Sequence, residues 1–328
     1  MDYNIKNTDC IEGASSIMDD SVFLGIYDPP FGIQEATFNK HYKRDKEFEV
    51  DGYVEAPDDY YNFTFQWMEQ AKRILKQDGS MYIISGWSNS DIIGSVIRKL
   101  NLHIINKIIW KFNFGVFTKK KYVTSHYEIF YVSKDKKVKT IFNTFCRYGS
   151  QQKSEKGESL LYQDMQSVWD INKEYHPGKI KNKNKLPEEL IKKMILYSSN
   201  EGDIVCDFFL GNFTTAIVAK KLGRIPIGFE LNKSAFNMGI ETLKNIKIED
   251  IEEVQNITPP NQGKKIDEKT ISAICDYFKQ NHKLKTKKDI IQYLMEKYGR
   301  GRFSIKNIID SYCYDCINDT NDNFNIFE

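Results

Sequence analysis

Short apolar runs alternate with amphipathic stretches along the first three quarters of the chain. An apolar run of about six residues predicts a buried strand, whereas apolar positions at helical spacing predict a helix. Strands that alternate with helices in this order favour an α/β fold with a mostly parallel sheet and right-handed crossovers. The expected strands are 3–6, 22–27, 80–85, 104–110, 122–133, 204–208 and 225–229, and the expected helices are 11–18, 60–75, 91–100, 186–198 and 215–222.

The remaining segments divide the chain into domains. Residues 134–168 have weak periodicity, which is typical of an insertion. Residues 251–263 contain Pro259-Pro260 and predict a linker, so we expect an α/β domain over 1–250 and a small helical domain over 264–328. The helices of this second domain are too short for a large core of their own, so we expect them to dock on the α/β domain, on a polyanion such as DNA or on a second copy. Basic residues between these helices favour contact with a DNA backbone over a purely structural role. The helices are expected at 271–278, 289–298 and 304–312.

A turn with two acceptors and an aromatic ring follows the strand 22–27. Its sequence is Asp28-Pro29-Pro30-Phe31, and the strand must end there because neither proline can donate a ladder hydrogen bond. The Asp28 carboxylate and the Pro29 carbonyl can both accept from an NH₂ group, and Phe31 offers a flat apolar face. These residues favour a planar ligand that carries an amino group. An ordinary capped strand end with a proline turn is the alternative.

A second candidate site lies in the β-α-β unit near residue 210. Its first strand is followed by a turn that contains Gly211, and Glu230 follows the second strand, 23 positions beyond Asp207. This layout is typical of a nucleoside site in which the acid binds the ribose hydroxyls. The unit lacks the three-glycine phosphate fingerprint, which favours a ligand with a ribose but no pyrophosphate. Turns of this shape also occur in α/β proteins without such a ligand.

The positive charge is segregated, although the net charge is only +2. Residues 1–100 contain 10 Lys or Arg against 17 Asp or Glu, whereas residues 101–153 contain 11 against 2. A second basic stretch, 279–306, has 9 against 2. Segregated positive charge is the pattern expected for a polyanion partner such as nucleic acid. The alternative is a set of solvated lysine faces.

The cysteines and the apolar runs bear on the compartment. The six cysteines show no disulfide-scaffold spacing, and no apolar run is long enough for a membrane span or follows a basic leader. We therefore expect a cytoplasmic protein that is not bound to a membrane. Cys313 and Cys316 form a lone C-x-x-C pair without the four ligands that a structural metal site needs, so no metal is expected.

Eight short motifs follow one another in a fixed order within residues 4–245. They are Thr8-Asp9-Cys10, Asp28-Pro29-Pro30-Phe31, Asp78-Gly79-Ser80, Ser125-His126-Tyr127-Glu128, His176-Pro177, the helix from Pro187, Asp207-Phe208-Phe209-Leu210-Gly211 and Gly228-Phe229-Glu230-Leu231. In this order they resemble the β group of DNA adenine-N6 amino-methyltransferases. Two places differ from that group: Gly211-Asn212-Phe213 replaces a glycine-rich turn, which brings a bulky ring near the methyl donor, and Asn184-Lys185-Leu186-Pro187 replaces a Thr-Gln-Lys-Pro.

This resemblance implies a Rossmann-like sheet of the methyltransferase type, S-adenosylmethionine as the methyl donor, and double-stranded DNA whose target adenine is flipped out. It implies a target-recognition segment at 134–170, and a homodimer and a cognate restriction endonuclease are expected as partners. The implied catalytic residues are Asp28, Pro29, Pro30 and Phe31. The implied donor-binding residues are Asp9, Cys10, Asp28, Asp207, Phe208, Phe209, Gly211, Asn212, Thr214, Glu230 and Leu231. The expected DNA-binding residues are Lys119, Lys120, Lys121, His126, Lys287, Arg300 and Arg302.

Two other functions stay open at this point. Asp-Pro-Pro-aromatic turns also serve RNA and protein N-methyltransferases, although the motif order and Ser125-His126-Tyr127-Glu128 disfavour these classes. The second alternative is a catalytically inactive DNA-binding module in which Phe213 blocks the donor pocket.

Overall fold

The computed structural model describes residues 3–31, 57–113, 115, 117, 119–173, 185–248, 266–282, 284–300 and 302–312. The chain divides into two compact units, one formed by residues 1–148 and 152–254 and the other by 149–151 and 255–328. The expected linker, His176-Pro177 and the Cys313–Cys316 pair lie outside the described residues.

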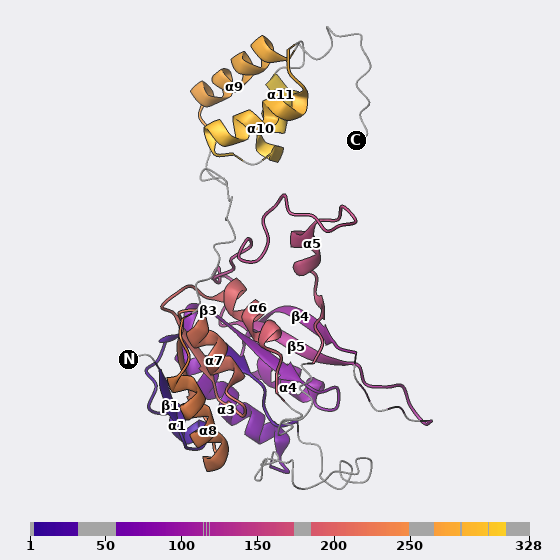
Figure 1. Ribbon diagram of the computed structural model, residues 1–328. Coiled ribbons are helices and arrows are strands. Elements are labelled where there is room, and N and C mark those ends of the chain that lie inside the picture. Colours follow the sequence, from indigo (N-terminus) through magenta and orange to yellow (C-terminus); the bar gives the residue numbers. More distant parts are fainter. Residues whose placement is uncertain are drawn as a thin grey trace. The chain divides into compact units, whose positions relative to one another are not determined.

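An eight-stranded sheet forms the centre of the larger unit (Figure 1). Its strand order is β1-β8-β7-β2-β3-β5-β4-β6. The pairs from β1 to β3 are parallel, β3–β5 and β5–β4 are antiparallel, and β6 is parallel to β4, which confirms the mostly parallel α/β class. The strands are β1 Asn4–Lys6, β2 Val22–Tyr27, β3 Leu75–Ser85, β4 His103–Lys111, β5 His126–Ser133, β6 Val168–Asp170, β7 Ile204–Asp207 and β8 Ile225–Phe229.

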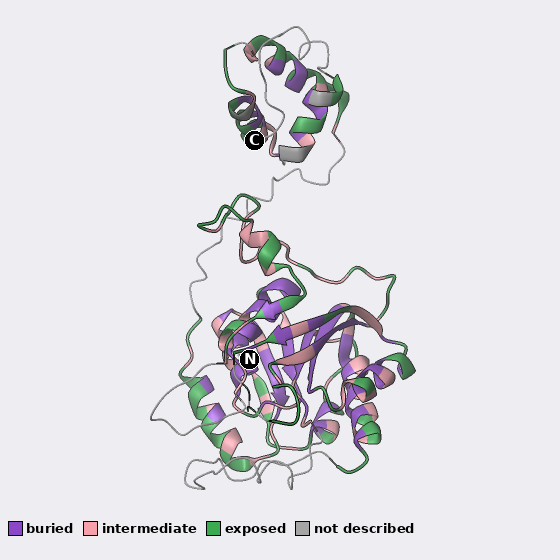
Figure 2. Cartoon of the chain, turned by 90° about the vertical axis from the view of Figure 1, so that its right-hand side faces the viewer, coloured by how far each residue is buried: buried purple, intermediate pink, exposed green. Residues whose placement is uncertain are grey.

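Helices cover both faces of this sheet. Neighbouring β3 residues point into separate apolar clusters, Met81 and Ile83 toward α1, α3 and α4, and Tyr82 and Ile84 toward α6 and α7. Figure 2 shows the buried residues concentrated on the strands and on the inner sides of these helices. The helices of the larger unit are α1 Cys10–Ala14, α3 Tyr60–Ile74, α4 Ser90–Lys99, α5 Leu160–Asp164, α6 Glu188–Ser198, α7 Thr214–Lys221 and α8 Lys233–Lys244.

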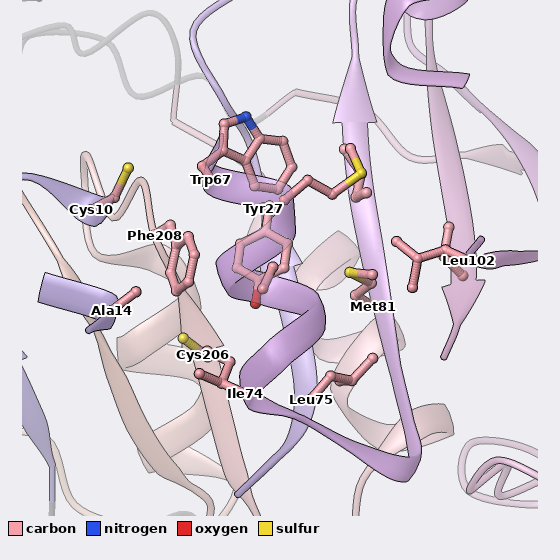
Figure 3. Close-up of a cluster of buried hydrophobic side chains, with 14 of the residues drawn as sticks. Cys10, Ala14, Tyr27, Trp67, Ile74, Leu75, Met81, Leu102, Cys206 and Phe208 are labelled. Carbon is pink, nitrogen blue, oxygen red and sulfur yellow. The ribbon is translucent and has the colours of Figure 1, made fainter. Parts of the chain in front are cut away.

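Aromatic side chains fill the core next to the strand β2. The Tyr27 ring lies 5.0 Å from the Phe208 ring and 5.5 Å from the Trp67 ring, measured between centroids (Figure 3). All three side chains are buried. The end of β2 is therefore clamped between β7 and α3, which fixes the start of the turn that follows it.

Two boundaries differ from the sequence prediction. The helix α3 ends at Ile74 and β3 begins at once, so Asp78-Gly79 lies inside the strand at an irregularity of the β2–β3 register. A Cβ atom on Gly79 would lie 2.8 Å from the Phe23 carbonyl oxygen, so glycine permits this close approach. The expected insertion 134–170 also ends within the sheet, because its last three residues form β6 on the edge of β4.

In its described residues the smaller unit contains three helices, α9 Glu268–Asn281, α10 Lys287–Tyr298 and α11 Arg302–Tyr312. Each of them contributes buried side chains to one apolar cluster, which includes Phe278, Leu294 and Ile309. These helices therefore form a small core together, and their docking on another surface stays a prediction. Amphipathic helices that supply three or more apolar positions each can close on one another.

None of the described helices is long and apolar enough to cross a membrane.

Candidate active site

The candidate site lies where the order of the strands reverses. From β7 the chain continues through α7 to β8 on one side, and from β2 it continues through α3 to β3 on the other. The helices α3 and α7 belong to clusters on opposite faces of the sheet, and the carboxyl ends of β2 and β7 are adjacent between them. Open α/β sheets bind ligands in a crevice at such a point, so we call this edge of the sheet the crevice. Asp28 follows β2 and Asp207 ends β7, which brings the two predicted motifs together.

Both aspartates have a pKa well above that of a free aspartate. Burial raises the pKa of Asp28 to about 7; the Asp207 carboxylate raises it as well, and the Lys173 ammonium opposes them. Burial likewise raises the pKa of Asp207 to about 7, against hydrogen bonds from Thr215 and from the Phe209 N–H. Two carboxyl groups that share a desolvated crevice favour a ligand with positive charge, because such a ligand stabilises their ionised forms.

The turn after β7 is shaped by two residues in the left-handed region, Gly211 with φ of 47° and Phe213 with φ of 60°. Phe213 is 0% exposed, and its ring packs between α7 and α8, 6.4 Å from the Phe236 ring. A Cβ atom on Gly239 would lie 2.2 Å from the Phe213 ring, so α8 has a glycine at this contact. We expected this ring near the donor, but it lies in the core instead. A ring that blocks the donor pocket was the reason for the alternative of an inactive DNA-binding module, and the burial of Phe213 removes that reason.

Glu230 closes the same turn from the end of β8. Its carboxylate accepts from the backbone N–H groups of Gly211 and Asn232, both at 2.7 Å. The Asn7 amide donates to the Glu230 carbonyl at 2.7 Å and so ties the end of β1 to this corner. The carboxylate is half-buried and fixed by these backbone N–H groups, and its two oxygens have about four acceptor positions, so it retains acceptor capacity for hydroxyl groups.

The other residues expected to bind the donor differ in how far they are buried. The side chains of Cys10, at the start of α1, and of Phe208, directly after β7, lie in the apolar core near Tyr27 (Figure 3). Contacts of these two residues with the donor would therefore come from their backbone. Asp9 caps α1, where it accepts from the Ile11 N–H at 2.8 Å. Phe209 is half-buried with its ring 5.5 Å from Trp67, Asn212 is half-buried and Leu231 is exposed. The hydroxyl of Thr214, at the start of α7, is buried without a hydrogen-bond partner in the described part of the chain.

Phe31 is held by residues that the sequence analysis missed. Its carbonyl accepts from the Asn89 amide, and a Cβ atom on Gly86 would lie 3.1 Å from its ring. The Tyr127 ring meets it edge-on at 5.2 Å. Phe31 itself stays half-buried, whereas Pro29 is buried. The ring is thus fixed in place beside Asp28. Gly86 and Asn89 follow β3 as ordinary turn residues, and no local pattern marks them.

The expected DNA-binding residues fall into two groups. Lys119, Lys120 and Lys121 are exposed between β4 and β5, beside the exposed Trp87 and Tyr122, and His126 begins β5 half-buried. In the smaller unit Lys287 begins α10 half-buried, and the side chain of Arg302 lies outside the described residues. Arg300 is only 8% exposed, so little of its side chain faces solvent, and its contact with DNA stays a prediction. It follows Gly299, which ends α10 in the left-handed conformation and turns the chain inward.

The segment 134–170 is tied to α6 by a buried polar cluster around Asp164. This carboxylate pairs with Arg147 at 3.1 Å and with Lys193 at 3.1 Å, and it accepts from the Tyr197 hydroxyl at 2.6 Å. The segment is therefore fixed at this point to the helix that precedes β7.

Comparison with known proteins identifies the family. Residues 22–241 match the model of a family described as DNA methylase. The DNA adenine methyltransferase YhdJ of Escherichia coli K12 is 33% identical over 261 residues, which cover 73% of this chain and 82% of YhdJ. The Type II methyltransferase M.HinfI of Haemophilus influenzae is 32% identical over 256 residues, which cover 74% of this chain and 68% of that enzyme.

Solved structures show the same fold. TTHA0409 of Thermus thermophilus, solved in complex with S-adenosyl-L-methionine, has a TM-score of 0.53 at 19% identity and covers 74% of this chain and 93% of its own. The cytosine-N4-specific PvuII DNA methyltransferase has a TM-score of 0.55 at 13% identity and covers 76% and 95%. The family match spans both strands of the crevice and the β-α-β unit beside them. The chain therefore belongs to the DNA methylase family and is a DNA methyltransferase.

Proposed function

We propose that this enzyme transfers a methyl group from S-adenosylmethionine to the N6 amino group of an adenine in double-stranded DNA. The observation that carries the proposal is the Asp28–Phe31 turn, which lies at the end of β2 directly beside the end of β7. The identity with YhdJ, an adenine methyltransferase by name, supports adenine as the target.

The crevice has the groups that this donor needs. Glu230 is fixed with spare acceptor capacity for ribose hydroxyls, and the buried Thr214 hydroxyl is available to a carboxylate. Asp28 and Asp207 supply negative charge for a cationic ligand. The Phe213 ring leaves the turn open because it packs in the core. When bound, S-adenosylmethionine supplies a methyl group activated by a sulfonium, so no covalent enzyme intermediate is needed.

The chain's own residues then act on the base. The lone pair of adenine N6 is delocalised into the ring, so the NH₂ group must be held by hydrogen bonds that turn this lone pair toward the methyl group. The Asp28 carboxylate and the Pro29 carbonyl serve as the two acceptors. The rate enhancement then comes from the orientation of the amino group and from electrostatic stabilisation of the transition state. Stacking on Phe31 offsets part of the cost of flipping the base, about 1–3 kcal/mol by analogy with aromatic stacking in single-strand binders.

The test is to methylate DNA with the purified enzyme and to identify the modified nucleoside by mass spectrometry. N6-methyladenine is the expected product. N4-methylcytosine would move the assignment to the other exocyclic amine, which the fold alone permits because PvuII methyltransferase shares it. Labelled RNA and histone in place of DNA test the RNA and protein alternatives.

Two variants separate the roles. Asp28→Ala should abolish transfer even at saturating donor, because Asp28 accepts from the base. It should cost donor binding no more than the charge that Asp28 contributes to the crevice, about tenfold in affinity. Glu230→Ala should lower donor affinity by up to a few kcal/mol, the size of one charge-assisted pair of hydrogen bonds. Retained turnover in the first variant removes Asp28 from the mechanism, and unchanged affinity in the second removes Glu230 from the donor site.

The proposal includes contacts to the DNA backbone. Lys119, Lys120 and Lys121 are exposed next to aromatic side chains, and Lys121 lies 5.4 Å from the Trp87 ring. In the smaller unit, the Tyr277 and Tyr293 rings stack at 4.4 Å, and Lys285 and Lys297 flank both rings. Phosphate contacts of this kind position a protein without reading sequence. The segment 134–170 is proposed to read the target sequence.

A homodimer and a cognate restriction endonuclease also belong to the proposal. They rest on the resemblance and on M.HinfI, which is a Type II methyltransferase by name. Light scattering of the purified protein tests the dimer, and restriction of unmethylated plasmid by an extract of the source cells tests the endonuclease.

A further inference from the structure

An aromatic cage around one lysine lies against the catalytic turn. The Lys173 ammonium lies 4.4 Å from the centroid of the Phe112 ring, 4.7 Å from that of Tyr127 and 5.8 Å from that of Trp110. It also donates to the Tyr127 hydroxyl at 3.5 Å. The three rings contact one another edge-on or tilted, with centroids 5.1–5.6 Å apart. The cage thus presents ring faces to a cation, which is the geometry of cation–π binding.

The backbone before Lys173 is fixed to the cage. The Trp110 indole donates to the Ile171 carbonyl at 2.8 Å, and the Ile171 N–H donates to the Lys111 carbonyl at 3.1 Å. Immediately upstream, Trp169 of β6 pairs with Trp110 of β4. Lys173 is therefore placed by the short strand β6, two residues beyond a doubly hydrogen-bonded position.

The cage borders the Asp28–Phe31 turn. Tyr127, one wall of the cage, meets the Phe31 ring at 5.2 Å. Burial among the rings lowers the pKa of Lys173, and the charge of Asp28 opposes this effect. Among the described residues, the charged groups that act on Asp28 are Asp207 from β7, which disfavours its ionisation, and Lys173, which favours it. Lys173 thus supplies the positive charge that acts on Asp28, next to the second carboxyl group, that of Asp207.

We propose that Lys173 is a positioning residue for methyl transfer, held by the cage of Trp110, Phe112 and Tyr127 so that its ammonium keeps Asp28 ionised and ready to accept from the amino group of the target base. The inference rests on the proposed function, because it concerns the same carboxylate. A lysine that merely covered the rings would be replaceable by an apolar side chain of equal length, since its methylene groups would supply the packing.

The experiment compares wild type with Lys173→Met and Lys173→Arg. Methionine keeps the length and apolar body of the side chain and removes the charge, whereas arginine keeps the charge and still stacks on rings. Single-turnover methyl transfer is measured from pH 6 to pH 9 with donor and DNA below saturation, so that the acid limb of the rate profile reports the free enzyme. Carbon-13 NMR of labelled aspartate, assigned with Asp28→Asn, follows the ionisation of Asp28 without any reaction.

In Lys173→Met the acid limb of the rate profile and the Asp28 titration should both move up by about one pH unit, the lower end of the effect of one nearby opposite charge. The rate then falls about fivefold at pH 7 and less than twofold at pH 9, and Lys173→Arg keeps the wild-type profile. An unmoved titration and acid limb in Lys173→Met overturn the inference, as does an equal loss at every pH in both variants, which indicates packing alone. Failure of wild type to methylate DNA would instead refute the proposed function.

Discussion

Donor binding by this enzyme should depend on pH, because the crevice holds two carboxyl groups with raised pKa. Asp28 and Asp207 each have a pKa of about 7, chiefly because of burial. A bound sulfonium and ammonium stabilise the ionised forms, so protonation competes with the donor. Because both carboxyl groups have raised pKa values, the affinity for a cation is high above pH 7 and falls as the pH drops through 7.

The size follows from the two pKa values. If both groups must be ionised in the complex, the affinity for S-adenosylmethionine falls about a hundredfold from pH 8 to pH 6, and if only one must be, about tenfold. Near pH 7 each group is about half protonated, so binding should release up to about one proton in total. Isothermal titration calorimetry in buffers of different ionisation enthalpy measures both the affinity and this proton count.

S-adenosylhomocysteine is the matched ligand, because it lacks the methyl group and the sulfonium charge. Its affinity should depend on pH less steeply than that of the donor. Asp28→Asn should leave only the dependence that comes from Asp207, about tenfold at most over the same range. An affinity for S-adenosylmethionine that is constant from pH 8 to pH 6, with no proton released, would refute the assignment of these carboxyl groups to a cationic ligand.

Three further outcomes are expected. Phe31→Ala should weaken capture of the flipped base, seen with a fluorescent base analogue at the target position, whereas Phe31→Tyr should be tolerated because stacking needs only a ring face; equal signals for both variants would contradict stacking. Gly239→Ala should lower the free energy of unfolding in urea by about 1–3 kcal/mol, because the new Cβ would lie 2.2 Å from the Phe213 ring. Gly94→Ala is the control: its Cβ would meet nothing closer than 3.6 Å, so helix propensity should raise the free energy of unfolding by up to about 1 kcal/mol. Deleting 264–328 should weaken DNA binding and flatten its salt dependence without changing the methylated sequence, whereas parallel salt slopes would argue against phosphate contacts by the smaller unit.

The local pattern of the sequence predicted most strands of the sheet and the turn Asp28–Phe31 at the candidate site. Strands such as Val22–Tyr27 and Ile225–Phe229 were predicted at their observed bounds, because an apolar run between turn residues carries its own signal. The resemblance assigned both Asp28 and Asp207 to the donor site, whereas their adjacency was established by the pairing of β2 with β7. Carboxyl ends of parallel strands lie on one edge of a sheet, which is why the two motifs meet there.

What only the tertiary structure decided depends on contacts between distant residues. The strand Val168–Asp170 is three residues long, too short for any periodicity, and its pairing with β4 brings Lys173 to the cage. The sequence likewise could not tell which aromatic side chains of the turn after β7 face the core. The left-handed backbone of Phe213 and the missing side chain of Gly239 decide that jointly, 26 positions apart. Burial of Arg300 and closure of α9 to α11 on one another arise in the same way, because a side chain's surroundings are set by helices that only folding brings together.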